Sequence, residues 1–170
     1  MKIDNFIKTY QSPKTVLMDD EVFVFGSNRD MGFHGAGAAG FASFGEFGNV
    51  WRKYSYDRRP KGWKGKWNVK GVAEGFQLGT KGKSYAIPTV TIAGAKRSIP
   101  LTEIQENIRK FYTFAKSRPD LKFFMAQESS GGLNGYSSEE MANIYSGDIP
   151  DNVYFSERFA KLLLYKLCEN

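Results

Sequence analysis

Two short apolar segments each lead directly into a glycine-rich loop, and this feature constrains the fold more than any other. Residues 21–25 and 121–127 are rich in β-branched, aromatic and aliphatic side chains, so both are predicted to be buried strands. Glycines recur within 26–40 and 131–135, and a segment typical of a helix follows each loop. A strand, a glycine loop and a helix N-terminus, in this order, commonly hold an anion.

The other segments predict further strands and helices in alternation. Residues 83–89 predict a short strand ended by its proline, and 152–155 a last strand. Helices are predicted over 36–47, from a capping box at Thr102 to the residue before Pro119, from a second capping box at 137–140, and over 157–167. This alternation favours parallel pairing with helices covering the sheet, which is an α/β domain.

Length and composition bound the remaining choices. The 170 residues predict a single domain over 1–170, with 50–82 as an excursion from it. Cys168 is the one cysteine, so no internal disulfide forms. No apolar run approaches the roughly 18 residues of a membrane helix, and the N-terminal residues lack a signal-peptide pattern, so we expect a cytoplasmic protein. The net charge of +6 suits an anionic partner, although a lysine-rich solvated surface accounts for it equally well.

The position of the two loops predicts a ligand site. Open α/β sheets bind ligands outside the carboxyl ends of their strands, so both loops share one edge if the strands are parallel. Glycine permits positive φ and lets backbone N–H groups approach phosphate oxygens. Neither loop ends in the Gly-Lys-Ser/Thr of a P-loop, and 35–40 lacks the acidic residue of a dinucleotide fingerprint about 20 residues later. A glycine turn after a strand is often simple punctuation, but two such loops favour a ligand.

Residues 22–39 and 124–136 resemble the two ligand loops of macro domains. In the first loop the matching residues are Asn28, Gly35, Gly37 and Ala39. In the second, a Ser-x-Gly-x-x-Gly-aromatic pattern is matched by Ser130, Gly132, Gly135 and Tyr136, whereas Leu133-Asn134 departs from the usual aliphatic-aromatic pair. Segments 25–28, 34–39 and 84–89 are more similar still to uncharacterised macro-like proteins of bacteria and phages.

This resemblance implies a three-layer fold with a mixed, mostly parallel sheet and helices on both faces. It also implies ADP-ribose or a close relative as the ligand, with its diphosphate between the loops. Asn28 would bind the distal ribose, and an acidic residue, Asp19 or Asp20, the adenine amino group. The residues expected to bind the ligand are Asp20, Gly26, Ser27, Asn28, Gly35, Ala36, Gly37, Ser129, Ser130, Gly131, Gly132, Leu133, Asn134, Gly135 and Tyr136. Neither a cofactor nor a metal is expected.

The sequence leaves open whether such a site is catalytic. His34, the only histidine, lies in the first loop, where it could act as an acid or base, contact phosphate, or simply bond a carbonyl. Zinc is not expected, because no second histidine exists and Cys168 is distant in sequence. Asp30, Glu46, Glu74 and Glu128 are the candidate carboxylates, each with a structural alternative. Burial would raise the pKa of Glu128, which ends a strand.

Hydrolysis of an ADP-ribosyl linkage is therefore one hypothesis for the site. Macro domains that remove ADP-ribose place an aspartate in the first glycine turn, and residues 35–40 contain none, which puts that mechanism in doubt. The candidate catalytic residues for a hydrolase are Asn28, His34, Glu74 and Glu128. They would position a water at the anomeric carbon.

Residues 51–70 interleave aromatic and basic side chains, and they support a second hypothesis. Tryptophans and tyrosines beside arginines and lysines are typical of proteins that bind single-stranded nucleic acid. The alternative is an insertion whose tryptophans pack on the core while its lysines face water. A third hypothesis is an interaction domain that keeps the fold without the ligand.

Overall fold

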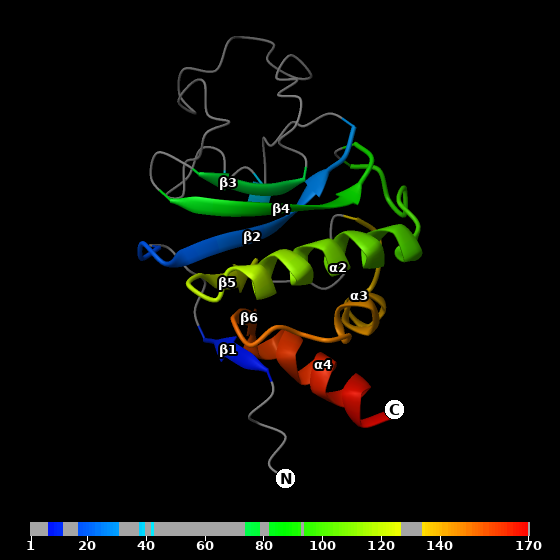
Figure 1. The fold of residues 1–170 in the computed structure, drawn as a ribbon. Helices are drawn as coiled ribbons and strands as arrows, with labels where there is room; N and C mark the ends of the chain where they lie inside the picture. Colours follow the sequence, from blue (N-terminus) through cyan, green and yellow to red (C-terminus); the bar gives the residue numbers. More distant parts are fainter. Residues whose placement is uncertain are drawn as a thin grey trace.

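The computed structural model describes residues 7–11, 17–30, 38, 39, 42, 74–78, 82–92, 94–126 and 134–169. In chain order the elements are β1 (Lys8–Tyr10), β2 (Glu21–Asn28), β3 (Gly75–Leu78), β4 (Lys83–Val90), α2 (Leu101–Ser117), β5 (Lys122–Met125), α3 (Ser138–Tyr145), β6 (Val153–Ser156) and α4 (Glu157–Glu169) (Figure 1). From β4 onward, strands and helices alternate as the sequence predicts.

The described strands form one six-stranded sheet in the order β1-β6-β5-β2-β4-β3. β2 lies inside the sheet between β5 and β4 and is parallel to both. β6 and β1 continue the parallel part, whereas β3 pairs antiparallel with β4 at the opposite margin. The sheet is therefore mixed and mostly parallel, as predicted. The carboxyl ends of the five parallel strands lie along one edge, which we call the carboxyl edge.

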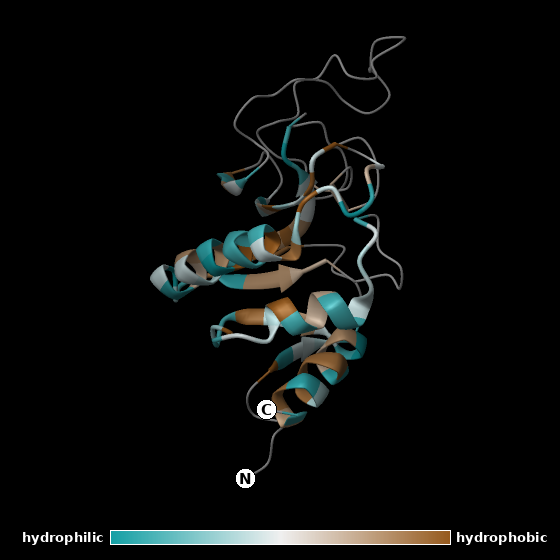
Figure 2. Ribbon diagram, turned by 90° about the vertical axis from the view of Figure 1, so that its right-hand side faces the viewer, coloured by the Kyte–Doolittle hydropathy of each residue, from teal (hydrophilic) through white to brown (hydrophobic). Residues whose placement is uncertain are grey.

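Helical segments cover both faces of the sheet. Val22 and Val24 belong to a large buried cluster that includes residues of α2, α3 and α4. The alternate residues Phe23 and Phe25 belong to a second cluster on the other face with Ala42, which has helical conformation. The helices carry hydrophobic residues toward the strands and hydrophilic ones on the side facing away (Figure 2). The predicted α/β layering is thus confirmed.

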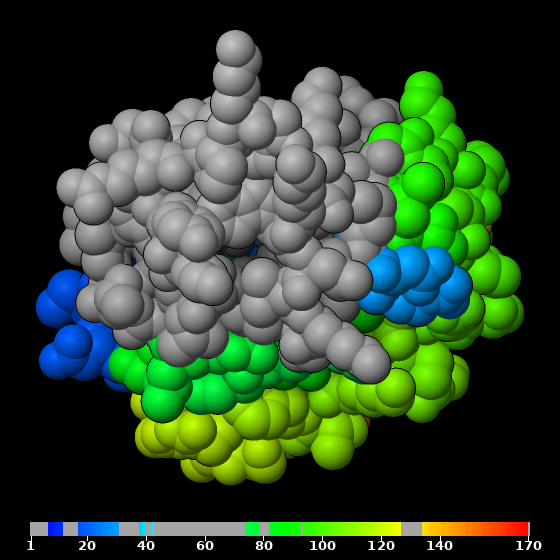
Figure 3. Space-filling model, turned by 90° about the horizontal axis from the view of Figure 1, so that it is seen from above, coloured from blue at the N-terminus to red at the C-terminus, as the bar shows by residue number. Residues whose placement is uncertain are grey.

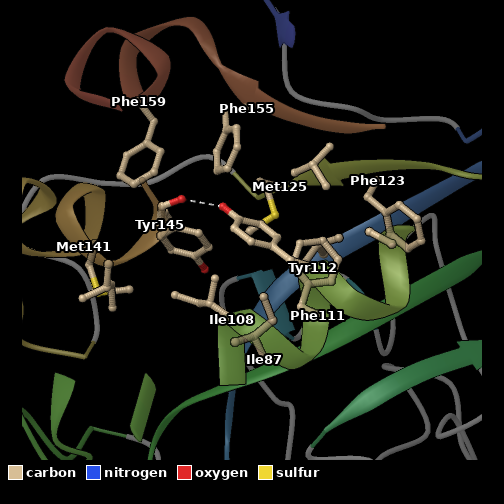
Figure 4. Packing of buried hydrophobic residues seen from close by; sticks show 14 of the residues in the cluster. Ile87, Ile108, Phe111, Tyr112, Phe123, Met125, Met141, Tyr145, Phe155 and Phe159 are labelled. Atoms are coloured by element: carbon tan, nitrogen blue, oxygen red, sulfur yellow. Dashed lines mark hydrogen bonds between the residues drawn. The ribbon is translucent and has the colours of Figure 1, made fainter. Parts of the chain in front are cut away.

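Aromatic rings fill the space between α2 and the sheet. The Phe111 ring is fully buried, with its centroid 4.9 Å from that of Tyr85 and 5.5 Å from that of Phe123. The Tyr112 hydroxyl donates a hydrogen bond to the Tyr145 carbonyl at 2.7 Å, which joins α2 to the end of α3 (Figure 4). Burying one such ring stabilises the fold by about 1.5–3 kcal/mol. This packing holds the helices that begin at the carboxyl edge.

The boundaries of α2 differ from the prediction at one end. The helix begins at Leu101 with Pro100 as its N-cap, and no side chain makes a capping bond, so the predicted capping box at Thr102 is wrong. The predicted buried face is confirmed for Ile104, Ile108, Phe111 and Ala115. At the other end, the Asn152 Nδ2 atom donates to the carbonyls of residues 115, 118 and 121 at 2.9–3.0 Å. These bonds tie the end of α2 and the turn that leads into β5 to the segment before β6.

Two further predictions concern the last helix and the membrane. Phe159 and Leu163 of α4 are buried as expected, but Leu167 is 39% exposed, so the predicted apolar face ends before it. Within the part of the chain that the structure describes, no helix is long and apolar enough to cross a bilayer.

Candidate functional site

The carboxyl ends of β2 and β5 lie side by side at the carboxyl edge. Val24 is paired with Met125, and the Ala126 amide donates to the Val24 carbonyl at 2.7 Å. On the other side of β2, the Arg29 amide donates to the Val90 carbonyl at 2.8 Å. The end of β2 lies beside the segment that follows β4 when the molecule is seen from above (Figure 3). Both glycine-rich segments therefore start from neighbouring strands at one edge, as the sequence predicts.

The chain leaves these two strands over opposite faces of the sheet. After β2, the helical residues Ala38, Ala39 and Ala42 pack on the face that carries Phe23 and Phe25. After β5, α3 packs into the cluster on the other face. The connections also run in opposite directions, because β2 continues to β3 and β4 while β5 continues to β6. This arrangement is a topological switch point, where open α/β sheets form a crevice for ligands.

The pairing of β2 with β4 shifts in register at this point, where β4 carries one extra residue. Ser27 is paired with Pro88 but Asn28 with Val90, so Thr89 has no partner on β2. Such bulges bend a strand and redirect its side chains, and they are common beside functional sites. The buried Asn107 side chain of α2 donates to the Pro88 carbonyl at 3.0 Å and holds the irregular segment in place. Pro88 therefore lies inside β4, and the prediction that it ends the strand is wrong.

Three of the expected ligand residues form the end of β2. Gly26 is exposed although its neighbours along the strand are buried, whereas Ser27 and Asn28 are 2% and 6% exposed. A Cβ atom at residue 26 would come within 2.9 Å of the Thr89 Oγ1 atom. Glycine at this position thus fits beside Thr89 and leaves the strand backbone accessible from outside.

An ion-pair cluster ties the residue after Asn28 to α2. Arg29 donates through Nε to Asp30 at 2.8 Å and through Nη1 to Glu103 in the first turn of α2 at 2.6 Å. The hydrogen bond from Arg29 lowers the pKa of Asp30, and the same two carboxylates raise the pKa of Arg29. Asp30 therefore stays ionised and bound to Arg29, so it is a weak candidate for a general base near neutral pH.

The end of the second loop is fastened to the segment that follows β4. The Arg97 amide donates to the Asn134 carbonyl at 2.7 Å, and the Tyr136 hydroxyl donates to the Ile99 carbonyl at 2.7 Å. The Asn134 side chain accepts from the Tyr136 amide at 3.1 Å and donates to Met141 Sδ at 3.4 Å. The polar groups of Asn134 and Tyr136 are thus used within the chain, and both residues hold the loop in place.

Gly135 makes the close approach between these two segments possible. Its φ is +80°, and an added Cβ would lie 2.7 Å from the Lys96 Cβ and 3.1 Å from the Arg97 amide nitrogen. Arg97 itself has a φ of 50°, an uncommon conformation for a residue with a side chain. Its guanidinium lies 4.8 Å from the Tyr136 ring centroid and pairs with Glu140 at 3.0 Å.

The start of α3 is capped as the sequence predicts. The Ser137 hydroxyl accepts from the Glu140 amide at 3.1 Å, and the Glu140 carboxylate accepts from the Ser137 amide at 2.8 Å. The bond from the Ser137 amide, with the help of Arg97, lowers the pKa of Glu140. The chain direction is therefore fixed where the second loop ends.

Two predicted site residues lie away from the others. Asp20 precedes β2, with its carboxylate 3.5 Å from the Lys122 ammonium, so it lies at the opposite edge of the sheet, about 25 Å from Asn28 at about 3.3 Å per residue. The adenine contact expected for Asp20 has no support in this placement. Glu74 adjoins β3 and pairs with Lys110 of α2 at 3.4 Å. Burial and then the Glu74 carboxylate raise the pKa of Tyr85 to about 12. In the sheet, β4 lies between β2 and the strand that Glu74 adjoins.

The remaining predicted residues lie outside the described part of the chain. They are His34, Gly35, Ala36, Gly37, Glu128, Ser129, Ser130, Gly131, Gly132 and Leu133, together with Glu46 and segment 51–70. Across the described ranges, no group of three or more histidine, cysteine, aspartate or glutamate side chains is arranged to hold a metal ion.

Comparison with solved structures finds a likeness in fold. The chain is similar to a mutant of the Oceanobacillus iheyensis macrodomain, with 18% sequence identity and a TM-score of 0.49, over 94% of this chain and 89% of that one. Neither a family model nor a curated protein sequence matches the chain. The fold class itself follows from the strand order and the two covered faces described above.

Sequence reasoning missed the residues that fix the edge from a distance. The Arg97 amide binds a carbonyl 37 residues later in the chain, and the Asn107 side chain binds one 19 residues earlier. Glu103 binds an arginine 74 residues earlier. No local pattern marks such contacts. Asn107 alone had a usable signal, because it is a polar residue on the predicted buried face of α2 beside Ile104 and Ile108.

Proposed function

We propose that the carboxyl edge between β2 and β5 binds ADP-ribose or a related diphosphate nucleotide. The observation that supports this proposal is the topological switch point, where two adjacent parallel strands lead to helices on opposite faces. The loops that leave these strands are rich in glycine, which suits close contact between backbone amides and phosphate. The resemblance of both loops to those of macro domains supplies the choice of ligand.

The described charges favour backbone contacts over arginine contacts to the diphosphate. Arg29 is already bound by Asp30 and Glu103, so it contributes little free positive charge at the end of β2. In the proposal, amides of residues 35–37 and 129–133 bind the two phosphates, and Asn28 binds the ribose. Gly26 is exposed, which leaves the strand backbone accessible to a ligand. The net charge of +6 adds a general attraction for an anion.

A hydrolytic activity at this site would draw on few residues. Asp30 is held by Arg29, and Glu74 is paired with Lys110 away from Asn28. His34 and Glu128 then remain as the acid–base candidates of the two loops. A water would attack the anomeric carbon, its proton would pass to one of these groups, and the bond to the leaving group would break.

Calorimetric titration with ADP-ribose, ADP and AMP tests the proposal. We expect a dissociation constant near the micromolar range, about −8 kcal/mol, for ADP-ribose and weaker binding of ADP and AMP. Gly132→Val should abolish binding, because a branched side chain blocks the phosphate approach. Gly147→Val is the matched control, because Gly147 has ordinary φ and open space around it.

Three outcomes would count against the proposal. They are no heat with any of the three nucleotides, equal affinity for all of them, or unchanged affinity in Gly132→Val.

A further titration with single-stranded nucleic acid at two salt concentrations examines segment 51–70. Binding through phosphate contacts to a polyanion weakens steeply with salt. If ADP-ribose binds, hydrolysis of an ADP-ribosyl substrate is then measured in His34→Ala and Glu128→Gln. A variant that loses hydrolysis but keeps its affinity for ADP-ribose would identify the acid–base group.

A further inference from the structure

A cavity of about 370 Å³ lies between the start of α3, the first turns of α4 and the segment that follows β4. Its lining includes Arg97, Arg158 and Leu162 together with residues 135–139. The volume falls in the range of small-molecule sites, about 300–1,000 Å³, and exceeds what a simple ion needs. The cavity is lined by no described residue of β2, so it lies on the α3–α4 side of residues 135 and 136.

Two arginines from separate segments line this cavity. Arg97 is held in place by Glu140, which binds its Nη2 atom at 3.0 and 3.1 Å, and by the Tyr136 ring at 4.8 Å. Among the contacts of the described residues, Nη2 is the only atom of the Arg97 side chain in that ion pair, which leaves Nε and Nη1 as donors. Arg158 makes no ion pair with any residue that the structure describes. Guanidinium forks match the oxygens of phosphate and carboxylate groups.

We propose that this cavity binds a small organic phosphate monoester, with the phosphate between Arg97 and Arg158 and the organic part against Leu162. A tetrahedral phosphate offers oxygens in several directions, so it can meet two guanidinium groups that come from different segments. A planar carboxylate is better suited to bidentate pairing with a single guanidinium group. The inference goes beyond the nucleotide site proposed above and does not depend on it, although Gly135 and Tyr136, which line the cavity, were also expected to bind the nucleotide.

One charge in the cavity opposes an anion and provides a sharp test. Glu139 also lines the cavity, whereas Glu140 is occupied by Arg97 and the Ser137 amide. The Glu139 carboxylate repels an anionic ligand, and because Glu139 is exposed, solvent screening keeps this repulsion small. Removing the charge should therefore raise the affinity for an anionic ligand modestly and lower the affinity for a cationic one.

Phenyl phosphate is the probe, because it joins a phosphate monoester to a small apolar ring and is not a fragment of ADP-ribose. Titration calorimetry and amide chemical-shift mapping on the full chain are run with phenyl phosphate, inorganic phosphate, benzoate and phenol. We expect phenyl phosphate to bind tightest and to shift the amides of residues 135–139. Arg158→Ala should weaken it at least tenfold, and Glu139→Gln should tighten it two- to fivefold.

Arg109→Ala is the matched control, because Arg109 is an exposed arginine of α2 that pairs only with Glu106 among the described residues. It should change the affinity less than twofold, and Arg158→Ala should leave the thermal midpoint unchanged because no described ion pair is lost. Equal weakening in both arginine variants would overturn the site. Tighter binding of benzoate or phenol than of phenyl phosphate would refute a phosphate monoester as the ligand. Weaker binding of phenyl phosphate by Glu139→Gln would refute an anionic ligand. Titration of Arg158→Ala with ADP-ribose keeps the two proposals apart, since that affinity should not change.

Discussion

Replacing Gly135 with alanine should damage the fold through one well-defined contact. The residue has a φ of +80°, and the new Cβ would lie 2.7 Å from the Lys96 Cβ and 3.1 Å from the Arg97 amide nitrogen. One of these neighbours is backbone and the other is the first side-chain atom of Lys96, so a rotamer change cannot relieve the overlap. The segment 96–97 must instead move away from the second loop.

The cost has two separable parts. A left-handed conformation costs alanine about 1–2 kcal/mol relative to glycine, and the stiffer unfolded chain returns about 0.4–1 kcal/mol of this. The overlap adds about 1–3 kcal/mol, the usual cost of overpacking. Displacement of the segment also strains the 2.7 Å bond from the Arg97 amide to the Asn134 carbonyl. The sum is about 1–5 kcal/mol, a large share of a typical stability of 5–15 kcal/mol.

Two other glycines separate these parts experimentally. Gly94 has a φ of +83° and nothing within 4 Å of an added Cβ, so Gly94→Ala carries the conformational cost alone. Gly147 has open space and an ordinary φ, so Gly147→Ala should be neutral or slightly stabilising. With a urea m-value near 2 kcal/mol/M, Gly135→Ala should lower the midpoint by about 0.5–2.3 M, and Gly94→Ala by less than about 0.8 M.

The comparison of Gly135→Ala with Gly94→Ala decides the outcome. If both variants lose the same stability, the contact with 96–97 contributes nothing and only the left-handed backbone matters. If Gly135→Ala is as stable as the wild type, the docking of the second loop on this segment is refuted. Near-ultraviolet circular dichroism of the Tyr136 environment reports whether the segments have separated.

Three further perturbations test other contacts. Tyr112→Phe removes the donor to the buried Tyr145 carbonyl and should cost about 1–2 kcal/mol in urea unfolding, with no change if water replaces the hydroxyl. Asn107→Ala leaves the Pro88 carbonyl without its donor beside the bulge and should cost about 1–3 kcal/mol, so unchanged stability would refute that role. The pKa of Glu140 is lowered in the fold, so its contribution is present above the ordinary glutamate pKa of about 4.3 and is lost as pH falls through the folded value. The urea midpoint should therefore fall more between pH 7 and pH 3 in the wild type than in Glu140→Gln, and parallel curves would contradict this.

Local patterns predicted the buried elements of this fold well. The run at 21–25 and the helical periodicity at Ile104, Ile108 and Phe111 both correspond to segments with one or two faces in the core. The capping box at Ser137 was also predictable, because its two bonds join residues three apart in the chain. Signals of this kind lie within a few residues, where sequence and geometry are closely coupled.

The errors arose where contacts distant in sequence decide the structure. β1 was not predicted, because Lys8–Tyr10 is a short segment with no apolar run and becomes a strand only by pairing with β6. Pro88 was expected to end β4, yet the register shift opposite Ser27 accommodates it inside the strand. The macro-domain resemblance implied Asp19 or Asp20 as the adenine contact, and the strand direction places Asp20 at the edge opposite the carboxyl edge.

The fixed ends of the two glycine-rich segments explain how loops of this composition could form a selective site. The first segment starts beside the bulge of β4 that Asn107 holds, and it continues through Arg29, which is bound to Glu103 of α2. The second segment starts at Ala126, bonded to β2, and ends at residues fastened to 97–99. Glycine is costly to order, since it loses more backbone freedom than any other residue. Ala126 and Asn134, which flank residues 127–133, are both bonded to neighbouring segments. Fixed anchors of this kind would lower the ordering cost of the proposed ligand binding, because preorganisation increases affinity without adding contacts.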